Sequence, residues 1–158
     1  MCIRDSSYTR GDVSGLASVG GLIGRSEETP NNMLTRSFST GNITATVNVA
    51  GGLIGQTAEP LAAVFPISDS FSTSEVTGPS SIGALFGSAF TQPMISNLYW
   101  FNTTQTTAVE CSGDSSVPGC MIAPDEAWFQ GNSTNAPLNN WNFTTVWEAV
   151  PGDYPKLR

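Results

Sequence analysis

The sequence contains no histidine, and only 12% of its 158 residues are charged. Without an imidazole, the chain cannot form a Ser-His-Asp triad, a Cys-His nucleophile pair or a histidine-based zinc site. Six Lys and Arg against 13 Asp and Glu give a net charge of −7. A negative net charge disfavours binding to the phosphate backbone of a nucleic acid, so no nucleic-acid partner is expected. Apolar runs are only a few residues long, and no membrane insertion is expected.

The polar residues are mostly uncharged: the chain holds 19 Ser, 17 Thr and 11 Asn, besides 16 Gly. At this length, the composition suits one compact domain or a short run of repeats. Residues 1–6 lack the apolar region of a secretory signal and are interpreted as a non-native leader. That interpretation leaves the cellular compartment open.

An internal repeat organises residues 7–96. Each copy begins with Ser, an aromatic residue and Ser or Thr; the aromatic residues are Tyr8, Phe38 and Phe71. A glycine-containing block follows in each copy, and its first glycine recurs at Gly20, Gly51 and Gly83. The two blocks keep step over three copies, which defines the units 7–36, 37–69 and 70–96.

Small β-favouring residues without a helical period predict short strands in each unit. A unit of this length cannot bury its own apolar residues, but stacked units pair equivalent strands in parallel and bring like side chains into ladders. The sequence therefore predicts an all-β fold, a parallel β-solenoid (β-helix) of about three coils. An antiparallel sandwich or propeller blade is the alternative. The predicted repeat core comprises Tyr8, Val13, Leu22, Ile23, Phe38, Ile43, Leu53, Ile54, Phe71, Val76, Leu85 and Phe86.

Three finer features of the repeat are also expected. The aromatic residue of each unit points inward, and the Gly-Gly-Leu-Ile-Gly block forms a single strand. The sequence leaves open whether Leu22 or Ile23 faces the core. Segments 25–35, 56–68 and 88–96 vary in length and contain proline, which predicts loops that leave the coil on one side.

The blocks Gly21-Leu22-Ile23-Gly24 and Gly52-Leu53-Ile54-Gly55, each preceded by the Ser-aromatic block, resemble the GLUG motif. The third copy departs from it with Ala84-Leu85-Phe86-Gly87. GLUG motifs occur in repeated copies in large bacterial surface and secreted proteins, including haemagglutinin-like adhesins and immunoglobulin A peptidases. The resemblance implies a secreted or cell-surface location and an accessory or adhesive role, and it transfers no catalytic residue.

Residues 97–158 have a different composition, and they contain all four tryptophans: Trp100, Trp128, Trp141 and Trp147. Residues 97–103 are predicted to form the last strand, and the remainder an irregular cap that covers the last coil and protects its strand edges. Residues 125–129 are expected to form one short helical turn. The alternative for the four tryptophans is a ligand surface on which sugar rings stack.

Cys111 and Cys120 enclose a turn-rich loop of eight residues. In a secreted protein this spacing predicts a local disulfide, which stabilises the fold by about 2–3 kcal/mol. A metal pair is disfavoured because no further Cys or His is nearby to complete four ligands. Cys2 belongs to the leader.

Carboxylates are the only side chains that could act as general acids or bases here. The candidates are Asp12, Asp69, Glu75, Asp125 and Glu126. Nothing in their spacing concentrates them on one face, so neither a paired-acid hydrolase site nor a calcium-dependent lyase site is predicted. No cofactor is expected, and a structural calcium ion is the open alternative.

The sequence thus predicts a structural or adhesive repeat segment of a secreted or cell-surface protein, which is not an enzyme. Its expected partners are a host protein, a matrix protein or a glycan. The alternative is a carbohydrate-binding or carbohydrate-active β-helix module.

Overall fold

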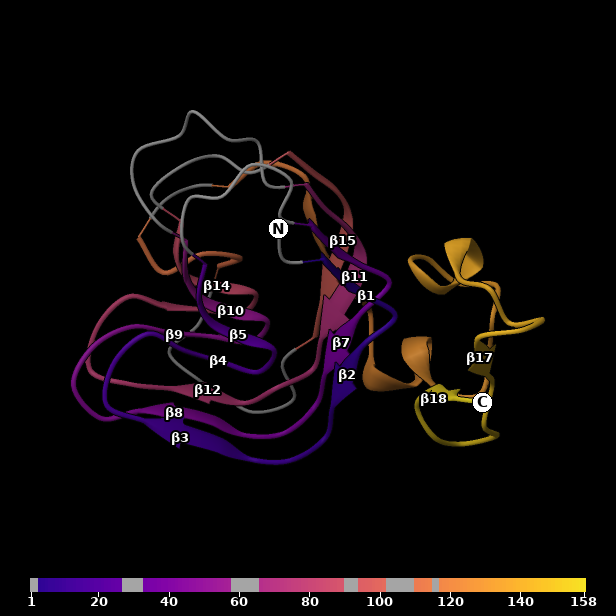
Figure 1. Ribbon diagram of the computed structural model, residues 1–158, viewed down its shortest axis with the longest axis horizontal. Coiled ribbons are helices and arrows are strands. Elements are labelled where there is room, and N and C mark those ends of the chain that lie inside the picture. Colours follow the sequence, from indigo (N-terminus) through magenta and orange to yellow (C-terminus); the bar gives the residue numbers. More distant parts are fainter. Residues whose placement is uncertain (1–2, 27–32, 58–65, 90–93, 102–109, 115–116) are drawn as a thin grey trace.

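The computed structural model describes residues 3–26, 33–57, 66–89, 94–101, 110–114 and 117–158. Almost all regular structure is β, and the chain passes through four sheets in turn before it returns to the first (Figure 1). Every strand pair among these four sheets is parallel. The predicted all-β fold with parallel strands is therefore confirmed, and the antiparallel alternative is wrong for the repeat.

Each sheet collects the equivalent strands of successive units. The largest sheet contains β1 (Ile3–Asp5), β2 (Tyr8–Thr9), β6 (Met33–Thr35), β7 (Phe38–Ser39), β11 (Ile67–Ser72), β15 (Ile95–Trp100) and β16 (Cys120–Ile122). The second contains β3 (Val13–Gly15), β8 (Ile43–Ala45) and β12 (Val76–Thr77). The third contains β4 (Val19–Gly20), β9 (Ala50–Gly51) and β13 (Ile82–Gly83). The fourth contains β5 (Ile23–Ser26), β10 (Ile54–Thr57) and β14 (Phe86–Ala89).

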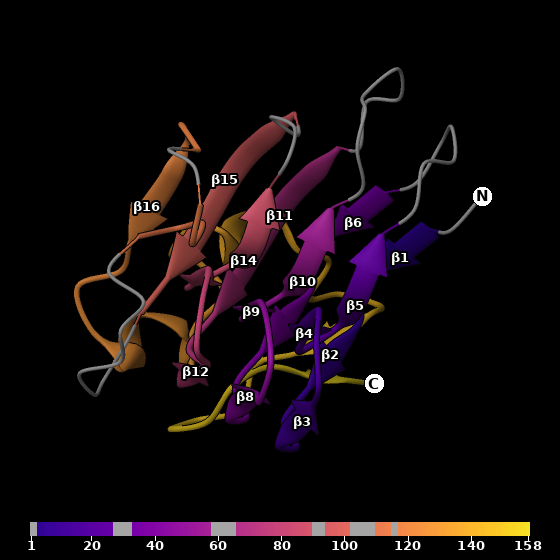
Figure 2. The same ribbon diagram turned by 90° about the vertical axis from the view of Figure 1, so that its left-hand side faces the viewer.

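We call one turn of the coil a rung: rung 1 is β1–β5, rung 2 is β6–β10 and rung 3 is β11–β14, so each rung begins a few residues before the corresponding sequence unit. The pairing register places homologous residues side by side, because Tyr8 pairs with Phe38 and Phe38 with Phe71. Val13, Ile43 and Val76 pair in the same way in the second sheet. Like residues therefore form ladders along the stack of rungs, whose equivalent strands lie side by side in Figure 2.

The glycine block turns a corner, so the expectation that it forms a single strand is wrong. Val19–Gly20 and Ile23–Ser26 lie in different sheets, with a bend between them. The close approach at this corner explains the glycine. A Cβ on Gly51 would overlap the carbonyl oxygen of Ile54 in its own rung and the amide nitrogen of Gly87 in the next.

The corner also decides which of the two apolar residues in the block faces the core. Leu53 and Ile54 both have no exposed surface, and both belong to one core cluster with Leu85 and Phe86. The chain changes direction between the two side chains, so both reach the interior. A second interior cluster is built around Ile43 and Val76.

The aromatic ladder points outward, and the prediction that it points inward is wrong. Phe38 and Phe71 share a cluster with the C-terminal segment. Leu34 and Ile67, which precede these rings by four residues in the same rungs, lie in the interior cluster. Between them lies a residue with positive φ, 46° at Arg36 and 50° at Asp69. A single left-handed residue interrupts the strand alternation and moves the following aromatic ring to the outer face.

The C-terminal segment lies along the outer face of the largest sheet rather than beyond the last rung (Figure 1). Its regular elements are short: η1 (Glu126–Phe129), η2 (Leu138–Asn140), and the antiparallel pair β17 (Trp147–Glu148) and β18 (Lys156–Leu157). The predicted helical turn is confirmed by η1, a 3₁₀ turn whose cap residue Asp125 accepts a hydrogen bond from the Trp128 amide.

Strands occupy both ends of each segment that was predicted to be a loop, and the middle of each segment lies outside the described residues. β6 lies within 25–35 and β11 begins within 56–68. Ile3–Asp5, assigned above to the leader, forms β1 and pairs with β6. The Asp5 carboxylate accepts a hydrogen bond from Arg36 Nε at 3.0 Å. The origin of residues 1–6 stays a prediction.

Replacing Phe38 by alanine should cost about 3–5 kcal/mol of unfolding free energy, because the ring is fully buried and the change leaves a cavity. Urea denaturation monitored by tryptophan fluorescence measures this. Tyr8→Ala, at the 38% exposed end of the same ladder, is the matched control and should cost clearly less. A loss below about 1 kcal/mol at Phe38 would contradict the packing described here.

Candidate functional site

The most extensively built region outside the repeat interior is the contact between the aromatic ladder and the C-terminal segment. The ring centroids of Tyr8 and Phe38 lie 5.1 Å apart, and those of Phe38 and Phe71 lie 4.9 Å apart, with nearly parallel planes. Phe129 from η1 stacks on Phe71 at 4.0 Å. Trp141 lies against both phenylalanines, 6.1 Å from Phe38 and 5.8 Å from Phe71.

The four tryptophans do not form an exposed platform. Trp100, Trp141 and Trp147 are 8%, 6% and 0% exposed, and Trp100 packs in the repeat interior, not with the other three. Trp128 is half-buried, and its indole N–H donates to the carbonyl oxygen of Ala136 at 2.6 Å. This burial removes three members of the candidate ligand surface and leaves Trp128 alone.

Arg10 fastens the end of the C-terminal segment to rung 1. Its guanidinium donates to both carboxylate oxygens of Asp153, at 3.1 and 2.9 Å, and to the carbonyl oxygens of Tyr154 and Pro155. The same guanidinium lies over the rings of Tyr8 and Tyr154. The hydrogen bonds from Arg10 lower the pKa of Asp153, and the Tyr154 amide adds to this effect.

Among the described residues, the pKa of Tyr154 departs furthest from its ordinary value. Its hydroxyl donates to Glu126 Oε1 and lies 2.7 Å from the Thr73 hydroxyl, so Thr73 acts as the donor to Tyr154. Burial disfavours the tyrosinate, and the hydrogen bond to the Glu126 carboxylate does so further. Together they raise the pKa of Tyr154 well above 10, although the hydrogen bond from Thr73 works in the opposite direction.

Most of the acidic candidates have a structural hydrogen-bond partner. Asp12 accepts from the Asn42 amide, Asp69 accepts from the side chains of Asn97 and Asn140, and Asp125 caps η1. Among the residues that the structure describes, no three His, Cys, Asp or Glu side chains lie close enough to hold a metal ion.

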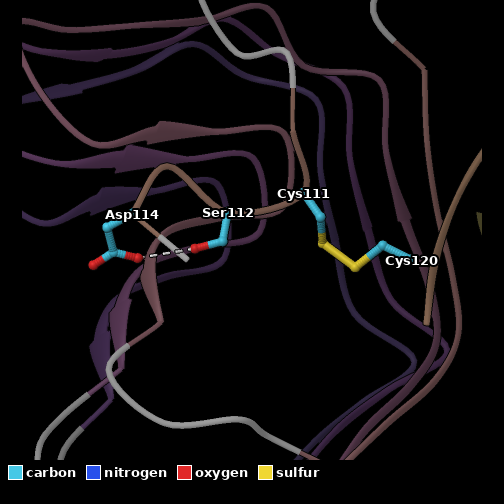
Figure 3. Close-up of a disulfide and its surroundings, with 4 residues drawn as sticks. All are labelled: Cys111, Ser112, Asp114 and Cys120. Atoms are coloured by element: carbon cyan, nitrogen blue, oxygen red, sulfur yellow. Dashed lines mark hydrogen bonds between the residues drawn. A yellow bond between two sulfur atoms is a disulfide. The ribbon is translucent and has the colours of Figure 1, made fainter. Parts of the chain in front are cut away.

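Cys111 and Cys120 form the predicted disulfide, with a Cα–Cα distance of 6.2 Å (Figure 3). Cys111 occupies the leucine position of the glycine block, because Leu22, Leu53 and Leu85 each donate a backbone hydrogen bond to the next member and Leu85 donates to Cys111. Cys120 lies in β16 and pairs with Leu98. The disulfide thus links the segment that stacks on the glycine block of rung 3 to β16 of the largest sheet.

Residues 110–113 are a fourth copy of the glycine block, which sequence reasoning missed. Phe86 pairs with Ser112, and the Gly113 amide donates to the carbonyl oxygens of Phe86 and Gly87. The Asp114 carboxylate accepts hydrogen bonds from the hydroxyls of Ser88 and Ser112 and from the Ala89 backbone amide. Figure 3 shows the hydrogen bond from Ser112. The only signal in the sequence was Gly113, which falls 26 residues after Gly87 instead of the usual 31 or 32.

No protein-family model and no curated protein matches the chain. Among solved structures, it is similar to a Bacteroides ovatus protein described as a putative immunoglobulin A1 protease, with a TM-score of 0.59 and 18% sequence identity. The similarity covers 96% of this chain and 56% of the other, so the chain spans about half the length of that protein. At this identity the likeness concerns the fold alone. None of the helices in the described ranges has the length and apolar character needed to cross a bilayer.

Removing the disulfide by Cys111→Ser with Cys120→Ser should lower the unfolding free energy by about 2–3 kcal/mol, because a loop of this length gains that much entropy when it opens. Urea denaturation of the variant and of the parent, with and without a thiol reductant, measures the loss. Reductant should destabilise the parent and leave the variant unchanged. An equal effect of reductant on both proteins would contradict the assignment.

The stability of the fold should decline as the pH rises above 10. The pKa of Tyr154 is higher in the folded state than in the unfolded state. The folded protein therefore keeps the Tyr154 hydroxyl proton at pH values at which the unfolded chain loses it. The stabilisation is therefore complete below the unfolded pKa and is lost at higher pH. Urea denaturation between pH 8 and pH 11 tests this, with Tyr154→Phe removing most of the alkaline decline. Tyr99→Phe, outside this network, is the control and should keep it; an unchanged decline in Tyr154→Phe would contradict the prediction.

Proposed function

We propose that this chain is a structural and adhesive repeat segment of a secreted or cell-surface protein of the GLUG-motif kind, with no catalysis of its own. In this proposal, rungs 1–3 are coils of a parallel β-solenoid, and residues 97–158 close and brace it. The disulfide supports an oxidising, extracellular location. The expected partner is a host protein, a matrix protein or a glycan.

The observation that carries the proposal is that aromatic and charged side chains, which could otherwise bind a ligand or take part in catalysis, make contacts within the chain. The aromatic rings of the C-terminal segment pack against the ladder. Arg10 is hydrogen-bonded to Asp153, and Tyr154 is hydrogen-bonded to Glu126. Such an arrangement stiffens a stack of rungs, as a spacer or stalk requires. The corners of the coil are among the surfaces that stay exposed and can contact a partner.

One corner offers an apolar contact that suits adhesion. Leu16 and Val47 occupy neighbouring rungs at the bend that follows β3 and β8, and the Val47 amide donates to the Leu16 carbonyl oxygen at 2.8 Å. Their side chains are 72% and 64% exposed. Adjacent apolar side chains that remain in water are a feature of interaction surfaces.

Beads coated with the purified chain test the adhesive role on panels of host matrix proteins and of glycans. We expect binding that weakens at least tenfold in Leu16→Ser with Val47→Ser and is retained in Trp128→Phe. The reverse pattern, with binding to glycans lost only in Trp128→Phe, would favour the carbohydrate-binding alternative. Absence of binding to either panel would overturn the adhesive role.

The absence of catalysis is tested separately by incubation with human immunoglobulin A1 and with acidic polysaccharides. We expect the heavy chain and the polysaccharides to stay intact on gels and by chromatography. Cleavage that is lost in Glu126→Gln, with Glu148→Gln as the matched control, would overturn this part of the proposal.

A further inference from the structure

The strand β16 is the edge of the largest sheet at the end of the stack opposite rung 1. It pairs with β15, and the described residues place no strand on its other side. The chain continues past β16 and crosses back over the outer face of the same sheet, so this edge arises within the chain. Figure 2 shows β16 at one end of the molecule, while both chain ends lie toward the other.

Backbone groups of β16 face this open side. The Ala123 amide donates to the Trp100 carbonyl oxygen at 2.8 Å, so Ala123 directs its N–H toward β15. Backbone groups alternate between the two sides of a strand, so the N–H and C=O groups of Ile122 face away from β15. Among the described residues, none donates a backbone hydrogen bond to these groups or accepts one from them. An unpaired strand edge of this kind is a template for an added strand.

Apolar side chains accompany the unpaired backbone groups. Met121 and Ile122 are 39% and 67% exposed. In the pairing register, Ser72 lies beside Trp100 and Trp100 beside Ile122. Trp100 is only 8% exposed, so Ile122 is the last member of this column and the one without a cover. A strand added to β16 would place an apolar side chain against Ile122, as Ile122 lies against Trp100.

The charges of the chain are separated along the stack. All six Lys and Arg lie within residues 4–36 and 156–158, and residues 37–155 contain none. Arg10 donates to both carboxylate oxygens of Asp153, which holds the C-terminal residues against rung 1. The cations therefore gather toward the end that carries rungs 1 and 2. The segments that form rung 3, β15 and β16 carry only acidic charge.

Two exposed carboxylates are tied close to β16. Glu110 is joined to Cys111, whose disulfide to Cys120 brings their Cα atoms to 6.2 Å. Asp125 follows shortly after the strand, and its position is fixed because it accepts a hydrogen bond from the Trp128 amide. Since no Lys or Arg belongs to this part of the chain, the potential here is negative and attracts cationic side chains.

We propose that β16 is a docking edge for a short extended segment of a partner protein in which Lys or Arg flank apolar residues. The segment adds a strand through the N–H and C=O groups of Ile122, packs an apolar side chain on Ile122, and places its cations near Glu110 and Asp125. It is short because β16 has only three residues and Pro124 has no N–H to offer on that side. This inference goes beyond the adhesive role proposed for the corner of the coil and does not depend on it.

The test uses the full chain and a dansyl-labelled peptide, Lys-Val-Ile-Thr-Val-Arg, followed by fluorescence anisotropy. One matched peptide has Glu at both charged positions, and another has N-methylated backbone amides at its centre. We expect saturable binding of the cationic peptide alone. The same peptide should raise the protection of the Ile122 amide from hydrogen exchange by about tenfold, as a newly formed backbone hydrogen bond does.

Two sets of variants locate the binding energy. Ile122→Pro removes an N–H that β15 does not use, so the fold should persist and binding should weaken about tenfold. Glu110→Gln with Asp125→Asn should weaken binding and remove most of its salt dependence, and Asn preserves the helix cap. The matched control, Asp12→Asn with Glu148→Gln, makes the same change of charge elsewhere and should bind as the parent does. If urea denaturation shows that Ile122→Pro is unfolded, the charge variants and the N-methylated peptide decide.

Several results would overturn the proposal. They are absence of saturable binding, equal binding of the cationic peptide and either matched peptide, and protection that appears in the strands of rung 1 instead of at Ile122. A parent chain that sediments as a dimer, with the Ile122 amide already protected before the peptide is added, would show that a second copy occupies β16. None of these results bears on adhesion at the corner formed by Leu16 and Val47.

Discussion

Backbone hydrogen bonds between equivalent strands of successive units are the interaction on which the rest of the structure depends. Each strand of rungs 1–3 has only two to six residues, which is too short to be stable with local contacts alone. Stacking gives every strand a parallel neighbour and places like side chains in contact, so burial of Leu53 or Ile43 requires the rung on either side. The stability of such a stack is the sum of contributions from each unit and from each interface. Close stacking also explains the corner glycines, since a side chain at Gly51 would push the next rung away.

The outward aromatic ladder makes the C-terminal segment a necessary part of the fold. Three stacked rings on the outside of a sheet would expose a large apolar surface to water. Phe129, Trp141 and Trp147 cover that surface along its length, while Arg10 holds the far end of the segment against rung 1. The segment therefore crosses several rungs in the direction opposite to the chain's advance through the repeat. It links rungs that otherwise contact only their immediate neighbours.

The repeat period favoured parallel pairing, because units of nearly constant length can stack in register, but it left an antiparallel sandwich or propeller blade as the alternative. The direction of the aromatic rings could not be predicted from strand alternation, since a single residue with positive φ, such as Arg36 or Asp69, reverses it. Because these residues are not glycines, their left-handed conformation could not be predicted from residue type. The fourth glycine block was missed because Cys111 replaces leucine and the spacing is shorter. The burial of the tryptophans depends on where the C-terminal segment lies, which only the assembled structure shows.

The same bracing that stiffens the molecule restricts where it can interact with others. The aromatic ladder of the largest sheet is covered by the C-terminal segment, and the hydroxyl of Tyr154 is hydrogen-bonded to the Glu126 carboxylate. Two of the surfaces that stay open are the corner where Leu16 and Val47 are exposed to water and the end of the stack at rung 1. These two surfaces differ in kind. A corner offers side chains that can change between units without disturbing the ladder, whereas the end offers backbone groups whose geometry the stack fixes. A change of partner is therefore accommodated more easily at the corners. Extension of the stack is accommodated more easily at its end.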